Sequence, residues 1–186
     1  MQWLKRGRVF DPTQHKLAQG CEQFAQSPQV LVFPDFVRIY FSTRAVDSTG
    51  KYLSHIAFVE MCKDFREVIR VSTQPVISLG ELGCFDEHGI FPMSIMRHGD
   101  LVYGYTCGWN RRVSVSVDTA IGLAISSDQG LTFERIGAGP VLAASQYEPC
   151  LVGDGFVKVI NGTFHMWYIF GTGWKSYAPD IPPDRT

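Results

Sequence analysis

The fold is indicated by one stretch of the sequence, which begins Phe91-Pro92-Met93-Ser94-Ile95, continues with Val102-Tyr103-Gly104-Tyr105-Thr106 and Thr119-Ala120-Ile121-Gly122-Leu123-Ala124, and ends Pro140-Val141-Leu142. Val, Ile, Tyr and Phe are frequent in its short apolar runs, and Gly, Asp, Asn or Pro separate the runs. Such runs favour β-strands. Almost no segment keeps apolar residues at helical spacing over three turns, so the sequence predicts an all-β protein.

The same order of motifs occurs in an earlier unit and begins again in a later one. An earlier unit contains Ser27-Pro28-Gln29-Val30-Leu31, an aromatic strand at 38–42, a small-residue strand at 54–58 and Pro75-Val76-Ile77. A later unit begins at Glu148-Pro149-Cys150-Leu151-Val152 and has its aromatic strand at 164–168. Pro28 lies 47 positions before Pro75, and Pro92 lies 48 positions before Pro140. Repeated units of about sixty residues with four strands each predict the blades of a β-propeller.

Individual strands and turns can also be placed. The expected strands are Gln29–Phe33, Val37–Ser42, Ser54–Met61, Leu101–Thr106, Val113–Val117, Ala120–Ser126 and Phe164–Phe170. Asn161-Gly162 predicts a tight hairpin turn, because both residue types tolerate positive φ. Arg97-His98-Gly99-Asp100 is expected to form a similar turn.

Composition and charge exclude several classes of protein. The chain has 186 residues, of which 17 are Lys or Arg and 18 are Asp or Glu, so its net charge of -1 argues against nucleic-acid binding. No apolar run has the roughly 18 residues of a membrane span. Met1–Arg8 contains basic residues without a following apolar segment, so no signal peptide is expected. The five cysteines include no Cys-x-x-Cys pair, which favours reduced thiols in a cytoplasmic protein and argues against a thiolate metal site.

The predicted domain organisation is a single partial propeller over residues 1–186. Its expected parts are a closing strand of a last blade at 1–12, blade 1 at 24–80, blade 2 at 85–143, part of blade 3 at 147–174 and an irregular tail at 175–186. About two and a half blades with an N-terminal closing strand cannot complete a ring. The chain is therefore expected to be the front part of a longer, truncated propeller, and its open sheet edge would allow self-association.

These motifs resemble a known superfamily. The inner strands with Pro, the aromatic strands and Ala120-Ile121-Gly122-Leu123-Ala124-Ile125-Ser126-Ser127-Asp128 resemble the five-bladed β-propellers of arabinanases, invertases and levansucrases, with glycoside hydrolase family 43 as the nearest named relative. The resemblance covers about residues 5–174. The run from Ser126 to Phe133 also resembles the Asp-box of sialidase-like propellers. That similarity implies a structural turn between the third and fourth strands of a blade, with Asp128 bound to turn amides.

The resemblance implies carboxylate chemistry around the propeller axis. In the family pattern, the base or nucleophile is an Asp before Pro on the first blade, and here Ser27 takes that position. An Asp before Pro on the third blade raises the pKa of the acid, and here Glu148 keeps a carboxylate. The acid itself is a Glu on a fourth blade, which this chain is not expected to contain. Ordinary hydrolysis by this chain alone is therefore doubtful on the family pattern.

Other polar residues offer a different site. Asp86, Glu87 and His88 precede the inner strand of the second unit, where they could bind sugar hydroxyls or transfer protons; the alternative is a solvated loop. A metal site is not expected, because no second His cluster accompanies them. Trp109 could stack on a sugar ring, and Arg111 or Arg112 could hold a phosphate or carboxylate. The alternative for Trp109 and Arg111 is an aromatic residue and an exposed arginine at the rim.

Two function classes remain open on the sequence alone. The first is a carbohydrate-active enzyme of glycoside-hydrolase type, without a cofactor. Its expected catalytic residues are Glu148, Asp86 and His88, and its expected substrate-binding residues are Glu87, Trp109, Arg111 and Ser27. The second is a non-catalytic module that binds a glycan or sugar nucleotide in polysaccharide biosynthesis. Ser27 in the base position favours binding, whereas Glu148 and the acidic loop before Pro92 favour catalysis.

Overall fold

The structure is a computed structural model that describes residues 2–5, 7–177 and 184–185. Within these residues the regular structure is β-strand apart from two short 3-10 turns, Pro12–Gln14 and Ala18–Gly20. The expectation of an all-β protein is confirmed. None of the described segments forms a helix with the length and apolar character that a membrane span requires.

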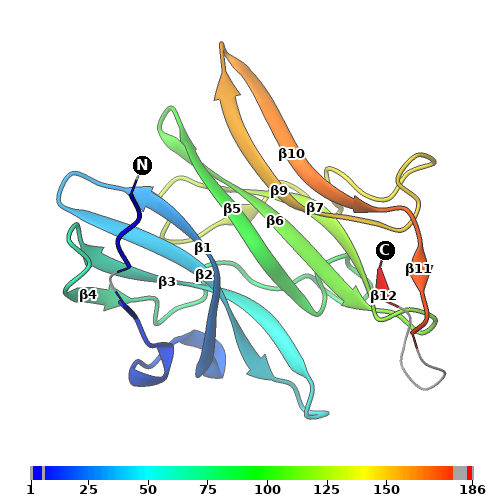
Figure 1. Ribbon diagram of the computed structural model, residues 1–186, viewed down its shortest axis with the longest axis horizontal. Helices are drawn as coiled ribbons and strands as arrows, with labels where there is room; N and C mark the ends of the chain where they lie inside the picture. Colours follow the sequence, from blue (N-terminus) through cyan, green and yellow to red (C-terminus); the bar gives the residue numbers. More distant parts are fainter. Residues whose placement is uncertain (1, 6, 178–183, 186) are drawn as a thin grey trace.

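Two antiparallel units of four strands make up most of the molecule (Figure 1). The first unit consists of β1 (Gln23–Val32), β2 (Phe36–Val46), β3 (Tyr52–Cys62) and β4 (Val68–Val71). The second consists of β5 (Gly89–His98), β6 (Leu101–Arg111), β7 (Val117–Ser126) and β8 (Glu134–Arg135). A single parallel pair between Ser54 and Gly89 joins β3 to β5. Successive strands in each unit are therefore neighbours in space, as the repeat predicts.

A long hairpin follows the second unit. It is formed by β9 (Leu151–Ile160) and β10 (Thr163–Gly171), and β9 lies against β5, β6 and β7. Its turn residues Asn161 and Gly162 have φ of 52° and 77°, which is the left-handed pair that a tight type I′ turn needs. The turn after β5 is also as expected, because His98 pairs with Leu101 and Gly99 has a φ of 60°. Beyond the hairpin, β11 (Trp174–Lys175) pairs with β12 (Asp184–Arg185).

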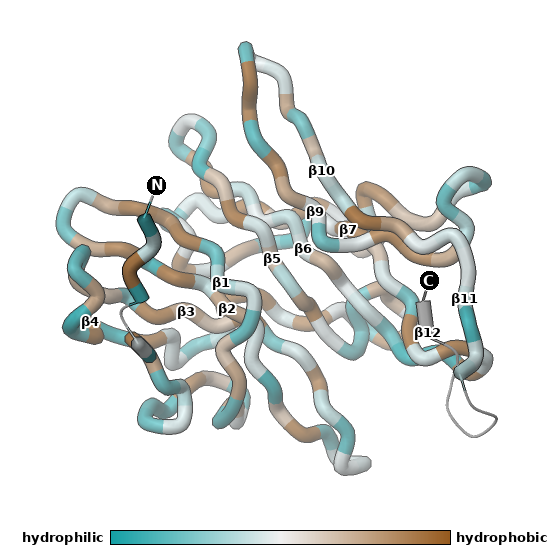
Figure 2. Tube along the Cα trace, viewed as in Figure 1, coloured by the Kyte–Doolittle hydropathy of each residue, from teal (hydrophilic) through white to brown (hydrophobic). Residues whose placement is uncertain are grey.

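Three apolar clusters hold these pieces together. One lies between the two four-stranded units and includes Tyr40, Phe58 and Phe133. A second cluster packs the other face of the first unit against the segment that contains Leu17. The third lies between the second unit and the hairpin around Ile121. In Figure 2 the hydrophobic colouring follows the strands, whereas several of the connecting turns are hydrophilic. Burial of these strand faces supplies the main favourable term for the fold.

The Asp-box resemblance predicts a local structure that is observed. Asp128 lies in the turn between β7 and β8, where its Oδ1 accepts hydrogen bonds from the Ser126 hydroxyl at 2.6 Å and the Leu131 amide at 2.9 Å. Its Oδ2 accepts from the Thr132 hydroxyl at 2.6 Å. The turn also contacts the first unit, because the Tyr40 hydroxyl donates to the Gly130 carbonyl at 2.8 Å. This turn therefore links the two units.

The expected strand at Val113–Val117 is wrong except for its last residue. The structure places 112–116 in the connection between β6 and β7, and Val113 is fully exposed. Alternating Val and Ser resemble a strand pattern, but no strand in the described part of the chain pairs with 112–116. An ion pair between Arg112 and Asp118 instead closes the connection.

The prolines occupy different places from those expected. Pro28 and Pro92 lie inside β1 and β5 rather than at their starts, and Pro149 lies two residues before β9. The ladder registers shift between Gln26 and Gln29 and between Ile90 and Met93. A proline has no N–H to donate, so an interruption of the ladder is where a strand can accommodate one.

The predicted closing strand and the predicted tail lie at the two ends of the chain. Residues 2–5 and 7–10 form no strand, and nothing in the described residues tests whether they would complete a last blade, so that assignment stays a prediction. The predicted irregular tail lies partly outside the described residues. In its described part, Lys175 pairs with Asp184.

Candidate functional site

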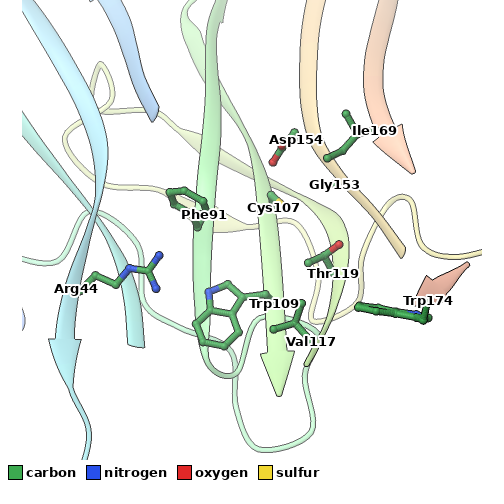
Figure 3. A pocket seen from close by; sticks show the side chains of 10 residues that line it. All are labelled: Arg44, Phe91, Cys107, Trp109, Val117, Thr119, Gly153, Asp154, Ile169 and Trp174. Carbon is green, nitrogen blue, oxygen red and sulfur yellow. The ribbon is translucent and has the colours of Figure 1, made fainter. Parts of the chain in front are cut away.

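A cleft of about 350 Å³ lies where the first unit, the second unit and the hairpin meet (Figure 3). Its lining residues come from seven strands and are Arg44, Phe91, Cys107, Trp109, Val117, Thr119, Gly153, Asp154, Ile169 and Trp174. A volume of this size falls in the range of small-ligand sites, which combine apolar walls with a few polar groups. This cleft is the candidate functional site.

Trp109 occupies the cleft because of a glycine on the adjacent strand. Gly89 pairs with Trp109 across β5 and β6. A Cβ atom at Gly89 would lie 2.3 Å from the indole Nε1 and 2.8 Å from the backbone nitrogen of Ser54. Gly89 therefore allows the indole to lie against the strand at the point where β5 meets β3.

His88 and Arg111 hold Trp109 from outside the cleft. The His88 ring stacks on the indole at 5.9 Å between centroids, and its Nδ1 accepts a hydrogen bond from the Arg111 amide at 3.4 Å. The Arg111 guanidinium lies over the indole at 5.8 Å. The structure thus brings these three expected site residues together. Glu87 is next to them, with its Oε1 3.8 Å from His88 Nε2 and its Oε2 accepting from the Gly83 amide at 2.9 Å.

The Arg111 guanidinium is already occupied by protein partners. It pairs with Asp47 at 3.1 Å and donates to the Tyr52 carbonyl at 2.7 Å. Hydrogen bonds to Asp47 from Thr49, from the Lys51 amide and from Arg111 keep the pKa of this carboxyl well below its usual range. Asp47 is therefore charged at neutral pH, and it fixes Arg111 as a support for Trp109.

Asp86 lies in a different environment. It is 1% exposed, and its Oδ2 accepts hydrogen bonds from Arg135 Nε at 3.0 Å and Nη2 at 2.6 Å. Its Oδ1 is buried and has no hydrogen-bond partner in the described part of the chain. The ion pair ties the segment before β5 to β8. Nothing in this arrangement directs the Asp86 carboxylate towards the cleft.

Glu148 is bound to the hairpin. One carboxylate oxygen accepts a hydrogen bond from the Tyr168 hydroxyl, and the other accepts from the Ser145 hydroxyl at 3.0 Å. The hydrogen bond to Glu148 raises the pKa of Tyr168, because an ionised phenol would lose this bond and face a carboxylate. Glu148 precedes β9 and is half-buried.

Asp86 and Glu148 are on opposite faces of the second unit. A Cβ atom at Gly108 would lie 2.5 Å from the Cβ of Asp86, whereas a Cβ at Gly153 on the hairpin would lie 2.8 Å from Cys107 Sγ. Cys107 and Gly108 are adjacent in β6, so they face opposite sides of the sheet. Tyr168, the partner of Glu148, packs with the hairpin cluster on the Cys107 side. The expectation that Asp86, His88 and Glu148 converge on one face therefore differs from the structure.

Ser27 is not among the residues that line the cleft. It sits in the irregular half of β1, half-buried, with a φ of 52°. A non-glycine residue at this φ is uncommon and reflects the interrupted ladder between Gln26 and Gln29.

Two charged residues of the cleft were not predicted from the sequence. Arg44 extends from β2 towards Phe91, and Asp154 lies on the other side of the cleft on β9 (Figure 3). Asp154 has a φ of 53° beside the register shift of the hairpin. The run Gly153-Asp154-Gly155 in an otherwise apolar strand was the available signal for a bulge at this position. No local signal marked Arg44.

Comparisons of the sequence with known proteins give two relatives. No model of a known protein family matches the chain. Two uncharacterized proteins of Mycobacterium tuberculosis, from strains CDC 1551 / Oshkosh and H37Rv, are each 32% identical over 187 residues. The alignments cover 98% of this chain and 59% of each relative, so the chain spans about three fifths of the length of the curated relatives it matches.

Solved glycoside hydrolases have similar folds. A Bombyx mori GH32 β-fructofuranosidase has a TM-score of 0.61 at 13% identity over 81% of this chain and 30% of the enzyme. A structure reported for the GH130 family, whose hydrolases target β-1,2-mannosidic linkages in Candida mannan, has a TM-score of 0.60 at 12% identity over 96% of this chain and 58% of its own. A family 117 glycoside hydrolase of Zobellia galactanivorans scores 0.55 at 15% identity over 81% and 44%.

The fold is that of the propeller-type glycoside hydrolases. The resemblance seen in the sequence motifs is confirmed at this level. Identities this low show the fold alone, since one fold can support many functions. In this chain the cleft contains two indoles that could stack on a ligand, one guanidinium that could bind an anion and one carboxylate that could accept hydrogen bonds.

Proposed function

We propose that this chain provides a saccharide-binding cleft within a five-bladed, glycosidase-type propeller, and that alone it binds the sugar without cleaving it. The observation that carries this proposal is the position of Trp109 in a cleft that also contains Trp174, Arg44 and Asp154. An indole covers the apolar face of a pyranose, while charged and polar groups bind its hydroxyls. The ligand would lie where the first unit, the second unit and the hairpin meet.

The arrangement of acids supports binding rather than cleavage. Glycoside hydrolysis needs two carboxyl groups about 5–5.5 Å apart in retaining enzymes or about 6.5–9.5 Å apart in inverting ones. Asp86 is paired with Arg135, and Glu148 is on the opposite face of the second unit from Asp86. Asp154 is the only carboxylate among the described residues that line the cleft. The family pattern points the same way, because Ser27 stands where the base is expected.

The strand arrangement supports a partial ring. The two four-stranded units correspond to two blades and the β9–β10 hairpin to half of a third. In this proposal, further blades complete both the ring and the funnel. The ligand is a glycan or a sugar nucleotide, and the latter would suit a role in polysaccharide biosynthesis.

Replacing Trp109 tests the binding proposal. An array of glycans and sugar nucleotides would identify the sugars that bind. Titration calorimetry would then compare the affinity of the intact chain with that of Trp109→Ala. We expect the affinity to fall about tenfold, or ~1.4 kcal/mol, because the stacking surface is lost. Trp3→Ala is the matched control, since Trp3 is 88% exposed and distant in sequence from the cleft strands. Equal affinities of Trp109→Ala and the intact chain would refute the assignment of the cleft.

Glycoside cleavage is the second candidate function. It is favoured by the position of the Asp154 carboxylate in the cleft. The left-handed backbone of Asp154 is of the kind that clusters at functional sites. Release of reducing sugar from the bound glycans distinguishes the two functions, and we expect none. Release that falls by orders of magnitude in Asp154→Asn or Glu148→Gln, with binding retained, would establish an enzyme instead.

A further inference from the structure

We infer that the saccharide bound in this cleft is acidic and that Arg44 recognises its carboxylate, as in a uronic acid. This inference rests on the proposed saccharide-binding function and specifies the class of sugar. The observation behind it is a guanidinium in the cleft that has no anionic partner among the residues that the structure describes.

Arg44 differs from the other arginines near the cleft. Arg111 is bound by Asp47, and Arg112 is bound by Asp118. Arg44 forms no ion pair and no side-chain hydrogen bond with any residue that the structure describes; its recorded side-chain contacts are with aromatic rings. Its guanidinium carbon lies 5.3 Å from the centroid of Phe91 and 5.9 Å from that of Phe24. The cation is therefore positioned by stacking, while its N–H groups have no acceptor in the described part of the chain.

A carboxylate fits these groups. The planar guanidinium presents two parallel N–H donors, which match the two oxygens of a carboxylate. Arg44 extends towards Phe91 on the same side of the cleft as Trp109 (Figure 3). A pyranose stacked on the Trp109 indole could direct a substituent towards Arg44. The aromatic rings around the guanidinium exclude water from one face and strengthen the pair.

The charges of the cleft favour a ligand with one negative charge over a ligand with two. Arg44 and Asp154 are the charged residues among those that line the described cleft. One cation can neutralise a monoanionic carboxylate, whereas a phosphate monoester carries nearly two charges and would also be repelled by Asp154. Asp154 is instead suited to accept hydrogen bonds from sugar hydroxyls. We therefore assign the ligand to the carboxylated sugars.

Matched pairs of sugars test this inference with the full chain. Methyl β-D-glucuronide is titrated against methyl β-D-glucoside, and methyl α-D-galacturonide against methyl α-D-galactoside, with glucose 6-phosphate as the phosphate probe. Members of each pair differ only at C6. We expect the acidic member of at least one pair to bind at least tenfold more tightly than its neutral partner, and more tightly than the phosphate.

Variants assign the preference to Arg44. Arg44→Gln should reduce the tenfold preference for the acidic sugar to less than twofold, and Arg44→Lys should restore only part of it. Arg97→Gln is the matched control, because Arg97 also stacks on a phenylalanine, at 4.9 Å from the Phe33 centroid, but does not line the cleft.

The outcomes separate this inference from the proposed function. Equal binding of acidic and neutral sugars, or tighter binding of glucose 6-phosphate, overturns the inference and leaves saccharide binding intact. A preference that survives Arg44→Gln also overturns the role of Arg44. No binding of any sugar, here or in the glycan array, overturns both.

Discussion

At the scale of single residues, the burial of His55 makes the stability of the folded protein depend on pH. It lies in β3 at 7% exposure, and its Nδ1 is buried without a hydrogen-bond partner among the described residues. Desolvation lowers the pKa of His55 below its ordinary value, since a buried imidazolium would lose its hydration. The folded protein therefore favours the neutral ring.

This burial predicts a stability that falls as the pH is lowered. The folded-state pKa is below that of the unfolded chain, so the contribution of His55 is complete above the unfolded value of about 6.5 and is lost as the pH falls below it. We expect the melting temperature to decrease between pH 7.5 and 5.5, and His55→Gln to reduce this slope. Thermal unfolding followed by circular dichroism measures both. An unchanged slope in His55→Gln would assign the pH dependence to other groups.

At the scale of elements, the turn between β7 and β8 depends on one carboxylate. Partial burial acts to raise the pKa of Asp128, but hydrogen bonds from Ser126, Thr132 and the turn amides outweigh this effect and lower it. A separate hydrogen bond, from the Tyr40 hydroxyl to the Gly130 carbonyl, holds the turn on the first unit. Because the folded pKa of Asp128 is lowered, the contribution of its hydrogen bonds is present above the unfolded value of about 3.9 and is lost as the pH falls below it.

Replacing Asp128 should therefore destabilise the protein. Each net hydrogen bond contributes about 0.5–1.5 kcal/mol, so we expect Asp128→Ala to lower the free energy of unfolding by roughly 2–3 kcal/mol in urea. Asp100→Ala in the exposed turn after β5 is the control and should stay within about 0.5 kcal/mol of the intact chain. If the two variants were equally stable, the Asp-box would not be needed for this turn.

At the scale of the whole molecule, the outer surface of the β9–β10 hairpin is unusually apolar. Phe156, Trp167 and Phe170 are 45%, 52% and 51% exposed. Among the described residues, β10 pairs only with β9, so one edge of the hairpin also presents unpaired backbone groups. Apolar surface beside an open strand edge promotes association between chains.

We therefore expect the chain to self-associate. In sedimentation, its average mass should rise with concentration, and Trp167→Lys should shift the equilibrium towards monomer by placing a charge beside the edge. Leu82→Lys is the control, because Leu82 is 91% exposed but lies in a loop away from the hairpin strands. A concentration-independent monomer would contradict this prediction.

The sequence by itself determined the features that depend on neighbouring residues. Alternating apolar runs specify strands because side-chain direction repeats every two residues, and Asn161-Gly162 specifies its turn because both residues accept positive φ. The Asp128 turn is equally local, since its donors lie within four residues. These regularities were sufficient for the all-β class, the repeated four-stranded units and the similarity to propeller-type glycoside hydrolases.

Only the tertiary structure decided which side chains share a site. Arg44 and Asp154 are 110 positions apart and line one cleft, whereas Asp86 is only two positions from His88 and is held elsewhere by Arg135. Trp109 and Arg111 were predictable as a local cluster, but the binding of Arg111 by Asp47 was not. Such partners are set by how the sheets pack, because a side chain is paired by whatever the packing brings within a few ångströms, at any distance along the chain.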